Sequence, residues 1–197
     1  NRFEIKENSK LLDLGCGSGK VLRTLHDYMI KMYVGIDLDM KQLLNGIKRT
    51  DSNRFQSSNS RFIHCNLKND WNTSKISIDY LDDQDKFDNV ICNFSLAHFY
   101  DNTFFEKLNK VTNDNSIFIF NIVNNNILNR WESGEDYMYL DGNEVKYFFS
   151  SVHNEEMTEK YITEDDIKTS LTNYGWEISH KTTSCGQNID SKYTWYI

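Results

Sequence analysis

The 197-residue sequence has no long hydrophobic run and no proline. No apolar stretch approaches the roughly 18 residues that a membrane-spanning helix needs, so we do not expect a transmembrane protein. The N-terminus lacks the basic and then apolar pattern of a secretory signal peptide, which predicts a cytoplasmic, intracellular protein. The missing proline, together with abundant Asn, Lys, Ile, Phe and Tyr, resembles the composition of proteins from AT-rich genomes.

Closely spaced cysteine pairs and an excess of positive charge are also missing. The four cysteines form no CxxC motif, which argues against zinc and against a disulfide framework and predicts free thiols at Cys16, Cys65, Cys92 and Cys185. With 22 Lys and Arg against 29 Asp and Glu, the formal charge is -7. Broad binding to nucleic acid depends on many contacts of Lys and Arg with phosphate, so we expect no DNA binding, whereas a small positive pocket remains compatible with this charge.

The composition is that of a globular protein. Hydrophobic residues make up 39% and aromatic residues 14% of the chain, more than a disordered chain contains. A chain of this length buries about 70% of the surface that it exposes when unfolded, which is enough for one substantial core. We therefore predict a single domain over residues 1–197, and we find no internal repeat.

Short apolar runs alternate with helix-like segments, a pattern typical of a parallel sheet with crossover helices. It predicts a Rossmann-like α/β sandwich with a mostly parallel, seven-stranded sheet and helices on both faces. Strands are expected at 10–14, 33–37, 61–65, 87–93, 116–122, 176–179 and 193–197, and helices at 19–30, 40–47, 104–111 and 163–174. Residues 51–60 are expected to form an exposed loop. The aromatic segment 124–158 is expected to be an inserted substrate-recognition element, with a hairpin formed by Tyr137, Tyr139, Tyr147, Phe148 and Phe149.

A glycine-rich turn follows the first predicted strand, where residues 11–20 read LLDLGCGSGK. A bound nucleoside must approach the backbone closely at such a turn, and glycine permits both the close approach and a positive φ. Lys20 stands where the dinucleotide-binding motif GxGxxG has its third glycine, so the spacing favours S-adenosylmethionine over NAD. The predicted cofactor contacts in this turn are Gly15, Cys16, Gly17 and Gly19.

Two carboxylates are predicted to complete the cofactor site. Asp13, at the end of the first strand, can accept hydrogen bonds from the ammonium group of the methionine moiety, directly or through water; the alternative is a helix N-cap. Asp37 ends the second strand roughly 20 residues beyond the glycines, where an acid is placed to accept both ribose hydroxyls. Asp39 is better explained as the cap of the helix that begins at Met40.

Further candidate cofactor contacts follow three of the strands. Asn66, after the third strand, has an amide oxygen that can accept a hydrogen bond from the adenine amino group, and Leu67 can contact the ring. Leu38, next to Asp37, is a further candidate. Asn93 and Phe94, directly after the fourth strand, complete the predicted set.

The segment 93–100, NFSLAHFY, follows the fourth strand. In proteins that bind S-adenosylmethionine on such a fold, this position faces the transferable methyl group, and we expect the same here. An aromatic, His-containing run there suits a flat acceptor with a polar edge, which makes His98, Phe99 and Tyr100 candidate substrate contacts. The alternative for Phe94, Leu96 and Phe99 is that these side chains pack beneath the sheet.

The chain resembles the class I S-adenosylmethionine-dependent methyltransferases along almost its whole length. Three short stretches are similar to the guanine-N7 methyltransferases that complete the mRNA cap, especially those inside viral or cytoplasmic-plasmid capping enzymes. NFSLAH at 93–98 resembles the family's QFSFHY, with the family's His at Ala97, or at His98 if the register shifts by one. GNEV at 142–145, followed by Phe148, resembles the same run in the family's inserted hairpin. MTEKYI at 157–162 resembles a Glu-Tyr pair that the family uses on guanine.

This resemblance implies an enzyme that transfers a methyl group from S-adenosylmethionine to guanine N7 of a capped RNA 5′ end (GpppN). It implies that Glu159 accepts the N1 and N2 protons of guanine, and that Tyr161 orients the base together with His98, Phe99 and Tyr100. Lys20, Arg23 and Arg130 are candidates for the cap phosphates; the alternative for each is a solvated surface charge. Since the chain begins at Asn1 without a Met, we expect a piece of a longer capping enzyme whose partners are its other domains or a stimulatory subunit.

The chemistry of this reaction demands little of the side chains. Guanine N7 carries a lone pair at neutral pH, so alignment with exclusion of water can supply most of the acceleration, and we name no general base, no catalytic acid and no metal. Two alternatives stay open. One is a methyltransferase that acts on a small molecule, and the other is a catalytically silent subunit with the methyltransferase fold.

Overall fold

The computed structural model describes residues 5, 8–25, 30–51, 60–71, 86–123, 131–150, 155–183 and 193–196. The chain divides into two compact units, which we call unit 1 (residues 1–120) and unit 2 (residues 121–197). Each unit is described by itself. None of the helices in the described ranges is long and apolar enough to cross a membrane.

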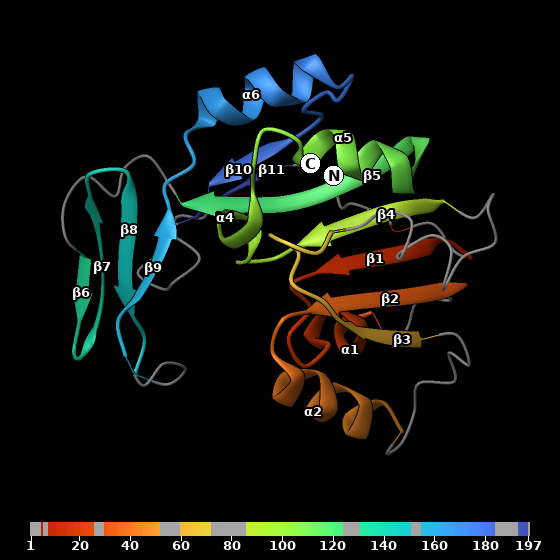
Figure 1. The fold of residues 1–197 in the computed structure, drawn as a ribbon, viewed down its shortest axis with the longest axis horizontal. Helices are drawn as coiled ribbons and strands as arrows, with labels where there is room; N and C mark the ends of the chain where they lie inside the picture. The colour runs from red at the N-terminus through yellow and green to blue at the C-terminus, as the bar shows by residue number, and fades with distance from the viewer. Residues whose placement is uncertain are drawn as a thin grey trace. The chain divides into compact units, whose positions relative to one another are not determined.

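Unit 1 is built on five parallel strands in the order β5-β4-β1-β2-β3, which lie side by side in Figure 1. The cores of β1, β2, β4 and β5 are apolar and largely buried, as expected for strands covered on both faces, whereas the residues of β3 are half-buried or exposed. The order reverses between β1 and β4, and ligands of open parallel sheets bind at the carboxyl ends of the strands beside such a reversal. The strands are β1 (Lys10–Leu14), β2 (Met32–Asp37), β3 (Ser60–His64), β4 (Phe87–Cys92) and β5 (Thr112–Val123).

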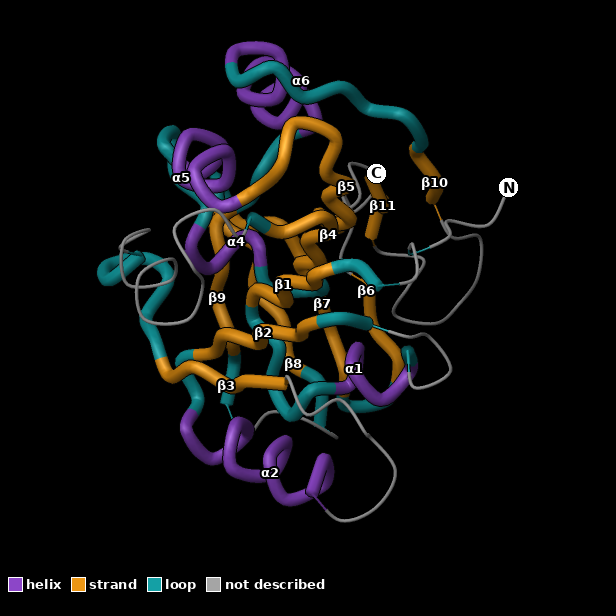
Figure 2. Tube along the Cα trace, turned by 90° about the vertical axis from the view of Figure 1, so that its right-hand side faces the viewer, coloured by secondary structure: helices purple, strands orange, loops and turns teal. Residues whose placement is uncertain are grey.

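Helices cover both faces of this sheet. On one face, Leu22 of α1 packs with Leu11, Tyr33 and Ile91 of the strands. On the other face, Phe104 of α5 packs against ring neighbours that include Phe118 of β5, and Figure 2 shows α1 and α5 on opposite sides of the strands. The helices of unit 1 are α1 (Lys20–Thr24), α2 (Met40–Asp51), α4 (Leu96–Phe99) and α5 (Phe104–Val111).

Unit 2 contains a four-stranded antiparallel sheet in the order β6-β7-β8-β9. Helix α6 begins with a capping box in which the Thr163 hydroxyl accepts from the backbone N–H of Asp166, while the Asp166 carboxylate accepts from the backbone of Thr163. The order of hydrogen-bonded strands is β10-β11-β5-β4-β1-β2-β3, in which β10 and β11 form an antiparallel pair and β11 is next to β5. The elements are β6 (Trp131–Ser133), β7 (Asp136–Asp141), β8 (Glu144–Phe148), β9 (Met157–Lys160), α6 (Glu164–Asn173), β10 (Lys181–Thr183) and β11 (Tyr193–Tyr196).

The predicted α/β architecture with a mostly parallel sheet is confirmed, and β1 and α5 have the predicted bounds. The predicted hairpin within 124–158 is also confirmed: β7 and β8 pair antiparallel, with Tyr137 opposite Phe148. Of the predicted loop 51–60, Asp51 ends α2 and Ser60 begins β3; residues 52–59 lie outside the described residues.

Three predicted elements are corrected. The helix expected over 19–30 ends at Thr24, and residues 26–29 lie outside the described ranges. The strand expected at 176–179 is wrong, because these residues form no strand. The Trp176 N–H instead donates to the carbonyl of Leu171 at 2.9 Å and closes the end of α6. The fifth strand starts at Thr112, four residues before the predicted start at Ser116.

Candidate functional site

The turn between β1 and α1 is held against the ends of two neighbouring strands. The backbone N–H groups of Gly15 and Cys16 both donate to the carbonyl of Ile36 on β2, at 2.8 and 3.0 Å. On the β4 side, the Ser95 hydroxyl donates to the carbonyl of Leu14 at 2.8 Å. Gly15 has a φ of +72°, and a Cβ at this position would overlap the Ser95 side chain. Only glycine therefore fits at this point of the turn.

Gly17 lies at the open side of the same turn. Its φ is +53°, and an added Cβ would meet no atom within 4 Å. Its N–H donates to Asp37 Oδ2 at 2.7 Å, while Asp37 Oδ1 accepts from the Asp39 N–H at 2.8 Å. A carboxylate offers about four lone pairs, so Asp37 retains acceptor capacity for ribose hydroxyls. Gly19, the fourth predicted contact in this turn, is the N-cap residue of α1.

Asp13 is 1% exposed and lies at the centre of the sheet, near the carboxyl end of β1. Its Oδ2 accepts a hydrogen bond from the Tyr33 hydroxyl at 2.7 Å, whereas Oδ1 is buried without a hydrogen-bond partner among the described residues. The pKa of Asp13 is raised to about 7, chiefly by burial and to a smaller extent by the nearby charge of Asp37, while the Tyr33 hydrogen bond acts in the opposite direction. The N-cap alternative is wrong, because Asp13 lies within a strand and α1 begins after Gly19.

The turn after β3 adjoins Asp37, because the Cys65 N–H donates to the Asp37 carbonyl at 3.0 Å. Asn66 Oδ1, the predicted acceptor for the adenine amino group, already accepts from the Lys68 N–H at 3.0 Å and has one further lone pair. Leu67 is 6% exposed, and Leu38 is 60% exposed. Leu38 thus offers apolar surface at the end of β2.

The turn after β4 contributes a feature that the sequence did not reveal. Phe94 has a φ of +58°, a conformation that a non-glycine aromatic residue rarely adopts. Asn93 Oδ1 is buried without a hydrogen-bond partner among the described residues. Ser95 was missed as a site residue because its role is a contact with Leu14, far away in the sequence.

The residues in and directly after α4 that were predicted to contact the methyl acceptor differ in exposure. His98 is exposed. Phe99 and Tyr100 are each 7% exposed and pack on Phe104, with ring centroids 6.0 and 5.9 Å apart. The packing alternative therefore describes Phe99, and Tyr100 has the same structural role.

Of the charged residues near the glycine turn, Arg23 and Asp39 have structural roles. Lys20 is exposed at the start of α1. Arg23 donates through its guanidinium to the carbonyl of Ser18 and so holds the turn itself. Asp39 Oδ1 accepts from the N–H groups of Lys41 and Gln42, which confirms its predicted role as the cap of α2. Arg130 lies outside the described residues.

Unit 2 brings together two of the stretches singled out in the sequence, 142–145 and 157–162. Val145 on β8 lies opposite Glu159 on β9, and the Tyr161 N–H donates to the Asn143 carbonyl at 2.9 Å. Glu159 is 7% exposed, and this burial raises its pKa to about 8. The nearby Tyr147 also has a raised pKa, mainly through burial and further through the charge of Glu159.

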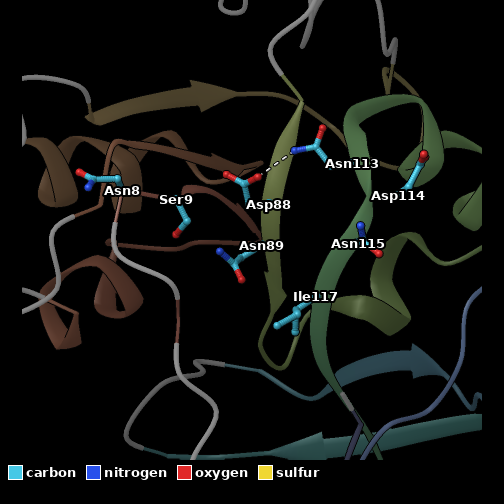
Figure 3. A pocket seen from close by; sticks show the side chains of 8 residues that line it. All are labelled: Asn8, Ser9, Asp88, Asn89, Asn113, Asp114, Asn115 and Ile117. Carbon is cyan, nitrogen blue, oxygen red and sulfur yellow. Dashed lines mark hydrogen bonds between the residues drawn. The ribbon is translucent and has the colours of Figure 1, made fainter.

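A separate polar pocket of about 530 Å³ lies near the amino ends of β1, β4 and β5 (Figure 3). The glycine turn lies at the opposite, carboxyl ends of the strands. Asp88 lines it, and both carboxylate oxygens of Asp88 are engaged, by the Lys10 N–H and by the Asn113 side-chain amide, each at 2.8 Å. We therefore place the candidate site at the carboxyl ends of the strands.

Among the described residues, Cys16, Cys65 and Cys92 are free thiols, as predicted, while Cys185 lies outside them.

A parallel sheet with a glycine turn after β1 and an acid at the end of β2 defines the Rossmann-like class of nucleoside-binding proteins. A family model described as a methyltransferase domain matches residues 5–184. The chain belongs to this family, the class I S-adenosylmethionine-dependent methyltransferase domains. No curated protein matches the sequence.

Solved structures show the same fold. An S-adenosylmethionine-dependent methyltransferase from Clostridium acetobutylicum superposes with a TM-score of 0.67 at 18% identity, over 96% of this chain and 82% of its own. One from Mesorhizobium loti gives 0.68 at 15% identity, over 98% and 92%. The magnesium protoporphyrin IX methyltransferase of Synechocystis PCC 6803 gives 0.59 at 15% identity, over 96% and 69%.

S-adenosylmethionine is the cofactor of this family, and the residues of the turn fit it. The open side of Gly17 leaves room beside the backbone for a nucleoside. Asp37 has acceptor capacity for two hydroxyls, and the unpartnered Oδ1 of Asp13 is an acceptor suited to an ammonium group. The chain thus offers a complementary group to the ribose and to the amino-acid end of this cofactor.

Proposed function

We propose that this methyltransferase domain methylates N7 of the guanine in an mRNA cap. The observation that carries the proposal is the pairing of β8 with β9, which puts Val145 of the GNEV stretch opposite Glu159 of the MTEKYI stretch. These stretches resemble the guanine-binding elements of the cap methyltransferases and are adjacent within unit 2. The proposed substrate is a capped RNA 5′ end, and the proposed partners are further capping-enzyme domains or a stimulatory subunit. We also propose that the enzyme works in the cytoplasm and that its working form has a sheet of seven strands.

Glu159 has the chemistry that guanine recognition requires. Guanine presents its N1 and N2 protons on one edge, and a carboxylate accepts both. Because Glu159 is buried, hydrogen bonds from the base would be stronger than in water, and they would favour the ionised form that burial disfavours. A base that presents an acceptor atom instead of a donor on this edge would face the Glu159 carboxylate with negative partial charge, so Glu159 would discriminate against it.

The remaining residues would bind and align rather than transfer protons. The cofactor supplies an electrophilic methyl group, and guanine N7 has a free lone pair at neutral pH. Asp13, Asp37 and the glycine turn would hold the cofactor, while Glu159 and Tyr161 would orient the base. Correct orientation and exclusion of water then provide the acceleration, without a general base.

The test is methyl transfer from S-adenosylmethionine to the cap dinucleotide GpppG, with the product identified as m7GpppG by mass spectrometry. We expect product with GpppG and none with ApppA. Glu159→Gln should lower kcat/KM at least a hundredfold, since loss of a charged hydrogen-bonding partner costs about 3 kcal/mol or more. Glu155→Gln, which changes an exposed carboxylate of the same segment, should leave activity unchanged. Absence of m7GpppG while adenosylhomocysteine still binds would refute the proposal.

Methyl transfer to GpppG and binding of adenosylhomocysteine also distinguish the proposed function from two other candidate functions. The net charge of -7 and the Synechocystis relative, named for magnesium protoporphyrin IX, favour a small-molecule acceptor as the second candidate. It predicts methylation of a free metabolite and indifference to cap analogues. A silent subunit would bind no adenosylhomocysteine, and the complementary groups at Asp13, Gly17 and Asp37 count against it.

A further inference from the structure

Tyr33 on β2 is a fully buried tyrosine with a polar contact inside the cofactor site. Its side chain is 0% exposed, and its hydroxyl donates to Asp13 Oδ2 at 2.7 Å. In the strand register, Tyr33 lies opposite Leu11, whereas Asp13 lies opposite Gly35. The hydroxyl therefore reaches Asp13 from two residues further back along β2.

Gly35 makes this reach possible. A Cβ on Gly35 would lie 2.8 Å from the Tyr33 hydroxyl oxygen and 2.8 Å from Cys16 Sγ, closer than side-chain atoms approach one another. The bare backbone of β2 thus gives the tyrosine hydroxyl room beside the Asp13 carboxylate. The space that a side chain at position 35 would need is thus occupied by the Tyr33 hydroxyl and its hydrogen bond to Asp13.

The hydrogen bond makes the two oxygens of Asp13 unequal. Oδ2 has a fixed donor, while Oδ1 has none among the described residues. The titratable groups that act on Asp13 are Tyr33 and Asp37 from β2, Cys16 from the glycine turn and Cys92 from β4. None of these groups of the described residues is a cation, and the ammonium group of a ligand would place a positively charged donor beside Asp13 Oδ1.

We propose that Tyr33 is a positioning residue for cofactor binding: its hydroxyl holds Oδ2 of Asp13 and leaves Oδ1 to the α-ammonium group of the cofactor. This inference rests on the family's cofactor and on the role proposed for Asp13, and it does not depend on the methyl acceptor. It assigns to the site a residue that lies outside the glycine turn and away from the carboxyl ends of the strands.

The hydroxyl also favours the ionised form of Asp13. Burial raises the pKa of this carboxyl group, the Tyr33 hydrogen bond lowers it, and the result is a pKa of about 7. Removing the hydroxyl should raise this pKa further, so that less carboxylate is available at neutral pH to pair with an ammonium group. Affinity for the cofactor would then fall, and its rise with pH would move to higher pH.

The experiment compares Tyr33→Phe with the wild-type chain by calorimetric titration between about pH 6 and pH 8, where this carboxyl group titrates. Adenosylhomocysteine carries the ammonium group, and 5′-methylthioadenosine has the same nucleoside without the amino-acid end. We expect Tyr33→Phe to weaken adenosylhomocysteine about tenfold at neutral pH, the effect of one charge-assisted hydrogen bond, and less at higher pH. Methylthioadenosine should bind both proteins within about twofold of each other.

A double-mutant cycle with Asp13→Asn separates positioning from packing. If Tyr33 acts through Asp13, then adding Tyr33→Phe to Asp13→Asn causes no further loss, and the pH dependence disappears in both Asn variants. Equal weakening of both ligands by Tyr33→Phe, or no weakening of either, would overturn the proposal, as would a wild-type chain that binds neither. Failure to methylate GpppG would leave these titrations intact and would count only against the proposed acceptor.

Discussion

Two buried carboxyl groups dominate the chemistry of individual residues in this chain. Asp13 and Glu159 are 1% and 7% exposed, and burial raises their pKa values to about 7 and about 8. Burial disfavours the ionised form of a carboxyl group, and groups whose pKa values are shifted in this way cluster at functional sites. One of these groups is suited to an ammonium group and the other to the edge of a base.

The pH dependence of stability tests the state of Glu159. The unfolded carboxyl group loses its proton near its ordinary value of 4.5, whereas the folded one retains it up to about pH 8. The free energy of unfolding should therefore fall as the pH rises between these values, by as much as about 4 kcal/mol from this group. Glu159→Gln should flatten the fall, most clearly between about pH 7 and pH 8, where Asp13 contributes least.

Urea unfolding followed by circular dichroism at several pH values provides the measurement. Glu155→Gln is the matched control, since Glu155 is exposed on the same segment and its substitution should leave the pH profile of the wild-type chain in place. A Glu159→Gln profile that keeps the wild-type slope above neutral pH would show that Glu159 is ionised in the folded chain, contrary to this account.

At the scale of elements, the glycine turn shows what a sequence can predict. The apolar run of β1, the spacing of Gly15, Gly17 and Gly19, and Asp37 at the end of β2 are local signals, and the structure has the strands and the turn where they were predicted. The cap of α2 by Asp39 is equally local. Such features depend on backbone conformation and on neighbours within a few residues, which a pattern records directly.

Contacts between segments that are distant along the chain could not be predicted from the sequence. The bond from Ser95 to Leu14 joins residues 81 positions apart, and that from Tyr33 to Asp13 depends on the register of β1 against β2. The apolar character of 176–179 suggested a strand, but Trp176 closes α6 instead. Tertiary neighbours decide these features, and a single sequence does not contain them.

The glycine turn gives a prediction at this scale. Gly15→Ala should destabilise the chain by about 2 kcal/mol or more and abolish adenosylhomocysteine binding, because the left-handed backbone and the overlap with Ser95 both oppose it. Gly17→Ala has only the backbone cost of about 1 kcal/mol, since its Cβ meets open space. Thermal denaturation and calorimetry of both variants decide this. Equal destabilisation would mean that the Ser95 side chain moves away at no cost.

At the scale of the whole molecule, the candidate groups are divided between the two units. The cofactor-binding turn, Asp13 and Asp37 belong to unit 1, which spans residues 1–120, while Glu159 and Tyr161 belong to unit 2. The family model spans most of both units. The three stretches that suggested the proposed acceptor also come from both units, with NFSLAH in unit 1 and the other two stretches in unit 2. Cofactor binding and acceptor binding should therefore leave different signatures along the chain.

Hydrogen exchange measured by mass spectrometry can detect these signatures. Adenosylhomocysteine at about a hundredfold excess over its Kd should stabilise the folded chain by about 2.7 kcal/mol and raise its Tm by roughly 5–10 °C. We expect exchange to slow most in peptides that cover the glycine turn and the end of β2, where Gly17 and Asp37 meet. Peptides of the hairpin β7–β8 should change much less. Asp13→Asn, as the control, should reduce the protection in the turn, whereas equal slowing in the turn and in the hairpin would show that the cofactor stabilises both units alike and would contradict the division of roles.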